Sequence, residues 1–414
     1  MGTIGFLFPG QGTQHIGMGE MLCKEYRIAD ETFEEAGEYL NLDLKKMCFE
    51  GSLTNLNQLE HMFCAILTCS VASFRVYMER IGIPPKLTAG HSLGEYSALV
   101  CADAMRLEDA LRLVKFRGSI AQELADAGNS WMAVVNGTEE ASLRAACQKA
   151  CQKGNYVAIS CYNSERQYTV SGHGAAVTQV QDQLADTGGE LTPLFMSAPF
   201  HSDLMKAAAD LLEEELSRYR YRKLRWPVVS NVRAVPYESE EDLVRSLKLQ
   251  LIKPVRWMES VRYMEAQGCD FFLEMGPQAI LSNLMNAHER RVAVYSFGQK
   301  DDREDVIRRL TGGLKEFIGS CLAIAVSTRN TNWDEAEYQA GVVRPYEKIE
   351  AIQKELDETG KLPERGQMLE AWNLLKTILQ TKRVPPEEQE ERFQELFDVT
   401  NTGTLFTDMA ERPI

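Results

Sequence analysis

Short apolar runs alternate along the first 300 residues with segments that repeat apolar positions every three or four residues. Residues 4–8 and 85–91 are apolar runs closed by turn residues, which predicts two buried strands. Residues 55–80 and 107–126 have the spacing of helices. Three more strand-like runs come later in the chain, at 227–231, 270–274 and 292–297. This alternation predicts a parallel sheet with helices on its faces.

A different pattern fills the stretch from 128 to 198. It predicts strands and helices in the order β-α-β-β-α-β, at 131–135, 138–152, 156–161, 168–171, 174–187 and 191–196. That order is typical of a ferredoxin-like unit. We therefore expect an α/β hydrolase-like domain made of residues 1–127 and 199–318, with a ferredoxin-like α+β subdomain, residues 128–198, inserted into it. The cleft between the two is the expected ligand site.

Residues 319–414 have a third character, helical throughout and without a reactive group of side chains. Helical spacing runs over 345–359 and 366–382, and Pro385-Pro386 precedes an acidic stretch at 387–397. We interpret this part as an appended C-terminal helical segment rather than as a second catalytic domain.

Composition and charge exclude several classes of function. The chain has 414 residues and a net charge of −15, which argues against nucleic-acid binding. It has no run of 18 apolar residues and no signal-like start, so we expect no membrane partner and a cytoplasmic location. The ten cysteines show no CxxC or Cys/His pattern, which favours reduced, packed thiols over a metal site.

Candidate chemistry begins at Gly90-His91-Ser92-Leu93-Gly94, between a predicted strand and a predicted helix. This is the arrangement of a nucleophile elbow, in which glycines let the chain turn sharply and the helix N-terminus faces a forming oxyanion. Ser92 is then a nucleophile, and the N–H of Leu93 is an oxyanion donor. The alternative is that Ser92 is a small residue in an ordinary turn.

A second oxyanion donor is expected from the loop 8-FPGQGTQ-14, at the N–H of Gln11. The loop also resembles a dinucleotide-binding turn, but His15 stands where the third glycine is required, which disfavours a nicotinamide site. Among six histidines, His201 follows the inserted subdomain and is the expected base. His91 is interpreted as structural, because neighbours on a strand point to opposite faces.

Arg117 lies within an apolar helical stretch, and two interpretations stay open for it. One is a surface or ion-paired arginine, and the other is a bidentate clamp for a substrate carboxylate. No acidic residue stands out to orient the imidazole of His201. A backbone carbonyl can do this by accepting the Nδ1–H bond.

Taken together, these segments resemble the malonyl-CoA:acyl carrier protein transacylases, including stand-alone acyltransferases of polyketide synthesis. The resemblance covers about residues 1–318 and rests on FPGQGTQ, GHSLGEYSALV, VKFRG, YNSERQYTVSG, APFHSDLM, SNV, KPVRW and EMGP in this order. It implies a role for Ser92 as the nucleophile and for His201 as the base. It also implies that Gln11 and Leu93 form the oxyanion hole and that Arg117 clamps the malonate carboxylate.

The resemblance implies further site residues. The carbonyl of Gln250 would orient His201, and Asn163 and Asn231 would be polar residues beside the substrate. Phe200, next to the base, goes with malonyl rather than methylmalonyl units in the similar polyketide enzymes, since a ring crowds an α-methyl branch.

The implied function is transfer of a malonyl group from malonyl-CoA to the phosphopantetheine thiol of an acyl carrier protein. A malonyl-serine ester is the intermediate, and neither a cofactor nor a metal is needed. The segment after 318 favours polyketide assembly over fatty-acid synthesis. Two alternatives stay open, namely a hydrolase that removes acyl groups from carrier proteins and a catalytically silent scaffold.

Overall fold

The computed structural model describes residues 2–151, 154–185, 188–194, 197–286, 292–400, 402–403 and 406. Contacts divide the chain into two compact units, Gly2–Arg303 and Glu304–Ile414. Helix α14 (Lys300–Ser327) crosses this division, and the predicted change of character at 318 lies inside it. The last positions of the elements predicted at 138–152, 174–187 and 191–196 lie outside the described residues.

The first unit is built on a five-stranded parallel sheet of order β7-β2-β1-β8-β9. Its central strand β1 pairs in parallel with β2 on one side and with β8 on the other. The strands are β1 (Ile4–Phe8), β2 (Leu87–Gly90), β7 (Val228–Val229), β8 (Phe271–Glu274) and β9 (Ala293–Ser296). Because all strands are parallel, their carboxyl ends share one edge, where β1 leads into the Gln11 loop and β2 into Ser92.

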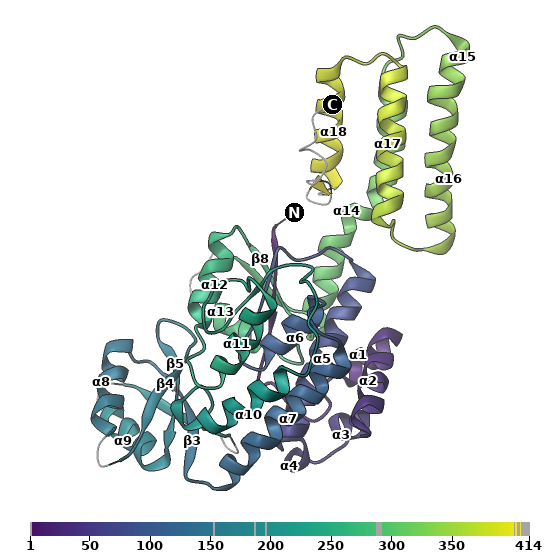
Figure 1. Cartoon of the computed structure of the whole chain (residues 1–414). Coiled ribbons are helices and arrows are strands. Elements are labelled where there is room, and N and C mark those ends of the chain that lie inside the picture. Colours follow the sequence, from purple (N-terminus) through teal and green to yellow (C-terminus); the bar gives the residue numbers. More distant parts are fainter. Residues whose placement is uncertain are drawn as a thin grey trace. The chain divides into compact units, whose positions relative to one another are not determined.

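Both faces of this sheet are covered, as the near-continuous apolar strands predict. Phe6 of β1 packs edge-on against Tyr77 of α5 (Leu59–Arg80). Its neighbour Leu7 points the other way, into a cluster with Trp257 and Phe272. Figure 1 shows α5, α6 and α7 grouped together beside the sheet.

The remaining helices of the first unit, apart from those of the insertion, are mostly short. They are α1 (Glu20–Glu25), α2 (Arg27–Leu40), α3 (Leu44–Phe49), α4 (Leu53–Leu56), α6 (Gly94–Cys101), α7 (Leu107–Asp126), the 3-10 turn η1 (Asp203–Met205), α10 (Lys206–Leu216), α11 (Glu240–Gln250), α12 (Trp257–Ala266) and α13 (Ile280–Asn286).

The inserted segment forms its own four-stranded antiparallel sheet of order β4-β5-β3-β6. The strands are β3 (Ser130–Asn136), β4 (Val157–Tyr162), β5 (Gln167–His173) and β6 (Glu190–Leu194), with helices α8 (Glu140–Ala150) and α9 (Gly174–Ala185). Figure 1 shows α8 and α9 beside the strands of this sheet. The apolar sides of both helices and of the sheet form one core that includes Val135, Leu143 and Val180. The predicted fold class, a parallel α/β domain carrying a ferredoxin-like insertion and a helical C-terminal segment, is confirmed.

Backbone hydrogen bonds join the insertion to the larger subdomain. Val255 receives the N–H of Tyr162 at 2.9 Å and donates its own N–H to Ser160 at 2.9 Å. The hydroxyl of Ser171 donates to the carbonyl of Phe200 at 2.7 Å. These bonds fix the insertion beside the carboxyl edge of the parallel sheet, next to His201.

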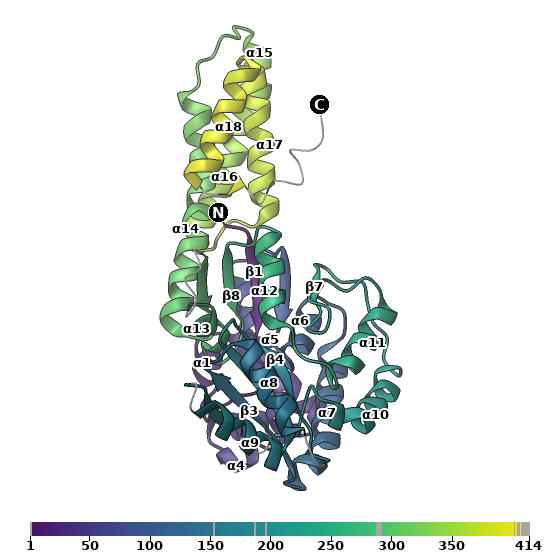
Figure 2. The ribbon, with the colours of Figure 1, turned by 90° about the vertical axis from the view of Figure 1, so that its left-hand side faces the viewer.

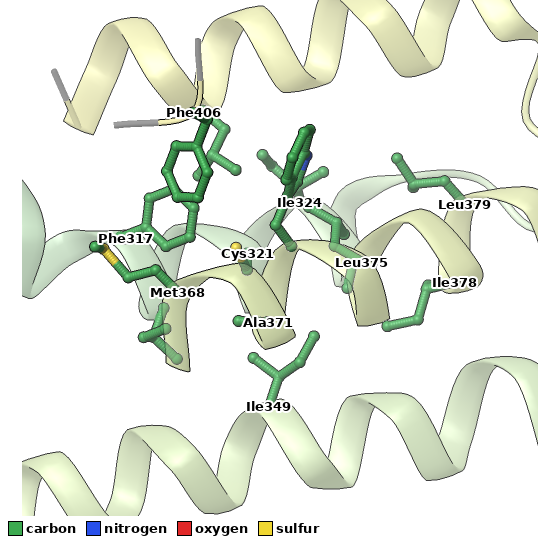
Figure 3. Close-up of a cluster of buried hydrophobic side chains, with 14 of the residues drawn as sticks. Phe317, Cys321, Ile324, Ile349, Met368, Ala371, Leu375, Ile378, Leu379 and Phe406 are labelled. Atoms are coloured by element: carbon green, nitrogen blue, oxygen red, sulfur yellow. The ribbon is translucent and has the colours of Figure 1, made fainter. Parts of the chain in front are cut away.

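The second unit is a helical bundle with its own core. It contains most of α14 together with α15 (Glu335–Tyr338), the π-helical turn η2 (Gln339–Val343), α16 (Arg344–Thr359), α17 (Arg365–Thr381) and α18 (Pro386–Thr400). Figures 1 and 2 show α16, α17 and α18 as neighbouring helices. Figure 3 shows apolar side chains of α14, α16 and α17 meeting, with Met368, Ala371 and Leu375 of α17 between Phe317 of α14 and Ile349 of α16. The spacing of the α17 residues is that of one helix face.

Two helices, α5 and α14, are long and apolar enough to cross a membrane by length and composition alone. Length and composition alone do not contradict the expectation of no membrane span, since the core helix of a folded protein has the same properties. In α5, 78% of the apolar window is buried inside the molecule. In α14, Phe317, Ile318 and Cys321 belong to the core of the bundle. Both helices use their apolar character in protein cores.

Candidate active site

The turn at Ser92 has the strained backbone of a nucleophile elbow. Ser92 has φ +51°, in the left-handed region that only a few per cent of non-glycine residues adopt. A Cβ on Gly90 would come within 2.0 Å of the backbone of Gly94, and a Cβ on Gly94 within 2.0 Å of the carbonyl oxygen of Phe8. Both glycines are therefore required by close backbone approach, which gives the sequence pattern its physical meaning.

The hydroxyl of Ser92 faces the imidazole of His201, although 109 positions separate them. Ser92 Oγ lies 2.8 Å from His201 Nε2. On the other side of the ring, His201 Nδ1 lies 2.6 Å from the carbonyl oxygen of Gln250. Since that carbonyl can only accept, Nδ1 carries the proton and Nε2 is free to accept the hydroxyl proton. The structure thus brings the predicted nucleophile, base and orienting carbonyl together.

Arg117 lies in the same place but almost entirely out of solvent. Its side chain is 1% exposed, and one terminal nitrogen lies 3.5 Å from Ser92 Oγ. The guanidinium carbon stands 4.6 Å from the ring centre of Phe200 and 4.9 Å from that of Phe63. No carboxylate among the described residues forms an ion pair with it, and its Nε has no hydrogen-bond partner there. A buried cation without a counter-ion is costly unless an anionic ligand completes it.

The first loop of the chain lies directly against the elbow. A Cβ on Gly10 would meet the carbonyl oxygen of His91 at 2.5 Å and the nitrogen of Leu93 at 3.4 Å. Within the described part of the chain, neither the N–H of Gln11 nor that of Leu93 has a hydrogen-bond partner. Two unpaired N–H groups on adjoining loops beside Ser92 suit an anionic oxygen.

Burial and charge set the protonation states in the site. Burial, then the neighbouring Arg117 cation and then His91, lower the pKa of His201 to about 3. The imidazole is therefore neutral near pH 7, which is the form that can accept a proton. Burial also lowers the pKa of Arg117, but a guanidinium stays charged in proteins.

A buried carboxylate, Glu95, lies beneath the elbow and was not anticipated as a site residue. Its oxygens accept from the N–H of Asn231 at 2.9 Å and from the side-chain amide of Gln250 at 2.5 Å. Burial raises its pKa to about 7, opposed by these hydrogen bonds and by Arg117. The only hint in the sequence is a charged residue opening an otherwise apolar helix.

Asn231, predicted as a substrate contact, has a different use. Its side-chain oxygen accepts the N–H of Ser92 at 2.7 Å, and its amide nitrogen donates to the carbonyl of Gly90 at 2.5 Å. Both ends of the amide are therefore occupied by the backbone of the elbow. Asn231 is 1% exposed and holds the turn instead of facing the cavity.

A cavity of about 200 Å³ opens beside Ser92 and His201. The parallel-sheet subdomain and the inserted subdomain both line it, through Gly10, Gln11, Gly12, Thr13, His91, Ser92, Met132, Val134, Cys161, Asn163, Gln167, Thr169, Leu194, Phe200, His201, Ile280, Leu281 and Leu284. The expected cleft between the subdomains is thus present. Among the described residues, no group of three or more His, Cys, Asp or Glu side chains is placed to hold a metal ion.

Two polar residues link the walls of this cavity. His91 Nε2 donates to the side-chain oxygen of Asn163 at 2.8 Å, and the His91 ring lies 5.4 Å from that of Trp257. Asn163 therefore faces the cavity as predicted, and His91, which was interpreted as structural, lines it too.

The chain matches the family model described as acyl transferase domain over residues 5–309. It is 41% identical over 286 residues to the malonyl CoA-acyl carrier protein transacylase of Escherichia coli K12, covering 69% of this chain and 92% of that relative. The chain belongs to the malonyl-CoA:acyl carrier protein transacylase family. Members of this family are acyltransferases, and so is this chain.

Other members of the family extend the comparison. A malonyl CoA-acyl carrier protein transacylase of Bacillus subtilis is 33% identical over 398 residues, covering 94% of this chain and 99% of the relative. That alignment is longer than Gly2–Arg303, so this relative shares sequence in the C-terminal unit as well. The solved transacylase from Coxiella burnetii has a TM-score of 0.72 at 35% identity, covering 75% of this chain and 98% of its own. A malonyl-transacylase solved with a type II polyketide synthase acyl-carrier protein has the same TM-score and identity and covers 74% and 99%.

Proposed function

We propose that this enzyme transfers a malonyl group from malonyl-CoA to the phosphopantetheine thiol of an acyl carrier protein, through a malonyl ester on Ser92. One observation carries the proposal. The buried Arg117, which forms no ion pair with a carboxylate of the described residues, stands 3.5 Å from a serine hydroxyl that is itself 2.8 Å from a neutral histidine. A nucleophile beside an unpaired buried cation suits an acyl group that carries its own carboxylate.

In the first half-reaction, Ser92 Oγ attacks the thioester carbon while His201 Nε2 takes the hydroxyl proton. The resulting oxyanion is held by the N–H groups of Gln11 and Leu93, each worth about 3 kcal/mol of barrier in comparable sites. The intermediate collapses, the C–S bond breaks, and the CoA thiolate takes the proton from His201. The malonyl group is left as an ester on Ser92.

In the second half-reaction the carrier thiol enters the same cavity. His201 takes its proton, the sulfur attacks the ester carbonyl, and the bond to Ser92 breaks as the serine oxygen recovers a proton. One thioester is exchanged for another, so the chemistry requires no oxidant, metal or cofactor, and we propose none. We also propose a reducing, cytoplasmic setting, which suits the ten free cysteines.

The malonate carboxylate has two effects at Arg117. It pairs with the buried guanidinium through charge-assisted hydrogen bonds. It also offsets the positive field that helps to lower the pKa of His201, so the bound substrate makes its own base stronger. Phe200, packed against Arg117, leaves little room for a branch at the α-carbon, which favours malonyl over methylmalonyl.

We propose polyketide assembly as the setting, with fatty-acid synthesis as the alternative. The C-terminal helical unit supports this choice, since the chemistry described above does not use it and the Escherichia coli relative aligns only over a shorter stretch. The solved neighbour bound to a polyketide carrier protein also supports it. Comparing kcat/KM for transfer to carrier proteins of the two kinds separates the settings.

The test is intact-mass analysis of the protein after brief mixing with malonyl-CoA, methylmalonyl-CoA or acetyl-CoA. We expect one malonyl group on the wild type, none on Ser92→Ala, and wild-type loading on Ser97→Ala. Ser97 is a matched control because it lies in α6, the helix that follows Ser92, and its buried hydroxyl has no hydrogen-bond partner among the described residues. Adding a carrier protein should then remove the malonyl group from the enzyme and place it on the carrier. Release as free malonate instead would indicate the hydrolase, and absence of any adduct would indicate a silent scaffold.

A further inference from the structure

Glu95 has more buried hydrogen bonds than a packing role requires. It opens helix α6, directly after Gly94, and its side chain is 1% exposed. One oxygen accepts from the N–H of Asn231 at 2.9 Å and from the hydroxyl of Tyr237 at 2.5 Å. The other accepts from the side-chain amide of Gln250 at 2.5 Å. Three donors from two other segments of the chain therefore meet on one carboxylate.

Each of two partners continues from Glu95 to a reacting group. Gln250 takes the Nδ1–H of His201 on its main-chain carbonyl, at 2.6 Å, and its side-chain amide also donates to the carbonyl of Ser92 at 3.0 Å. Asn231 accepts the N–H of Ser92 at 2.7 Å. Glu95 thus lies one residue away from the base on one side and one residue away from the nucleophile on the other.

The orientation of the Gln250 amide shows which group controls it. Its nitrogen serves two acceptors, Glu95 and Ser92, while its oxygen is buried and has no partner among the described residues. Turning the amide over would put that oxygen against both acceptors. An unpaired buried carbonyl costs about 1–3 kcal/mol. The hydrogen bond from the amide nitrogen to the Glu95 carboxylate must therefore outweigh this cost.

We propose that Glu95 is the positioning residue for the Ser92–His201 pair, holding Gln250 and Asn231 so that the hydroxyl and the imidazole meet in line. This inference rests on the proposed function only for the identity of the acyl group. It concerns the reactivity of Ser92 toward any electrophile. Glu95 touches neither substrate nor reacting atoms, and it acts through the two residues between.

Replacing Glu95 by Gln tests the donor pattern with little change of shape. A glutamine can keep an oxygen toward Asn231 and Tyr237, but its NH₂ group then faces the NH₂ group of Gln250. Two donors repel, so Gln250 must shift and take its carbonyl away from His201. A displacement of about 1 Å in such a site costs on the order of 100-fold in rate.

The experiment uses a fluorophosphonate, which reacts with an activated serine and needs no malonyl recognition. The second-order labelling rate of Ser92 is measured for the wild type, Glu95→Gln, Gln250→Glu and the double variant that carries both changes. Asp109→Asn, another buried carboxylate on a different helix, is the matched control and should label at the wild-type rate. We expect about 100-fold slower labelling for Glu95→Gln.

The double variant separates positioning from simple packing. In it, the amide of residue 95 can donate to the new carboxylate at 250, which restores one donor–acceptor pair. We expect it to label at least tenfold faster than either single variant, with rates compared at a temperature where every variant is folded. Losses that add in the double variant, or wild-type labelling by Glu95→Gln, would overturn the proposal.

The outcome is independent of the proposed acyl group. If wild-type Ser92 reacts with the fluorophosphonate but takes no malonyl group, the proposed function fails while the role of Glu95 is still decided by the labelling rates. Should Glu95→Gln fail to fold, Tyr237→Phe removes one donor to the same carboxylate. Its labelling should then fall by less than tenfold, and a fall equal to that of Ser92→Ala would contradict a positioning role.

Discussion

Replacing Arg117 by methionine should separate the stability of this enzyme from its activity. The guanidinium is 1% exposed and forms no direct ion pair among the described residues, although the Glu95 carboxylate attracts it. Its desolvation therefore opposes folding by several kcal/mol. Stacking on Phe63 and Phe200 returns about 0.5–2 kcal/mol for each ring. Methionine keeps most of the apolar stem and can pack on both rings. We therefore expect Arg117→Met to raise the free energy of unfolding by about 1–3 kcal/mol.

The same change should remove most of the malonyl loading. Two charge-assisted hydrogen bonds to a carboxylate contribute about 1.5–3 kcal/mol each. Their combined loss of about 3–6 kcal/mol corresponds to roughly a 100-fold to 10,000-fold lower kcat/KM, at about 1.4 kcal/mol per factor of ten. Acetyl-CoA has no carboxylate for Arg117 to bind, so its loading should not slow.

Urea unfolding and quenched loading followed by intact mass measure the two effects. Arg112→Met is the control, since Arg112 lies on the same helix with its side chain 58% exposed. Its stability should change by no more than about 0.5 kcal/mol. A variant Arg117→Met that loads malonyl as fast as the wild type, or that unfolds more easily than the control, would refute the reasoning about a buried, unpaired cation.

Four other outcomes are expected. In Gly94→Ala the new Cβ would stand 2.0 Å from the carbonyl oxygen of Phe8, so strand β1 and helix α6 must separate by about 1 Å. The rate at which the fluorophosphonate labels Ser92 should then fall about 100-fold, even where circular dichroism shows a folded protein. Phe200→Ala should raise the loading of methylmalonyl relative to malonyl by about 10–200-fold, measured by competition between the two CoA esters. In the free enzyme His201, with a pKa of about 3 instead of 6.5, is deprotonated from about pH 5 to pH 8, so kcat/KM for loading should show no inflection from it. Glu95, whose pKa burial raises to about 7, should instead make the rate fall as the pH drops below 7; an inflection that persists in Glu95→Gln would contradict this assignment.

The strands and the elbow were predictable because their signals are local. An apolar run, a turn and two glycines around Ser92 belong to one stretch of chain, and the 2.0 Å approaches at Gly90 and Gly94 show why no other residue serves there. The position of His201 could be inferred from chain order. Its exact partner on the other side, the carbonyl of Gln250, came only from the resemblance to a known family.

The network under the elbow could not be predicted from the sequence alone. Three separate segments supply its members, Glu95, Asn231 and Gln250. These segments meet only in the folded protein, at the carboxyl edge of the parallel sheet. The direction of the Asn231 amide, toward backbone and away from the cavity, is likewise a tertiary fact. The same holds for the division between the two compact units, which falls after Arg303 near the start of the continuous helix α14, whereas the sequence indicates a change of character at 318.

The small size of the reaction chamber has a kinetic consequence. At about 200 Å³ it is below the usual range for a drug-sized ligand, about 300–1,000 Å³, so most of a bulky donor stays outside while its reactive end is admitted. Under the proposed exchange, the CoA donor and the carrier acceptor must then bind at the same cavity one after the other. Free CoA then competes with the incoming carrier protein. Because one thioester is exchanged for another, the relative concentrations of the two partners decide the net direction of transfer.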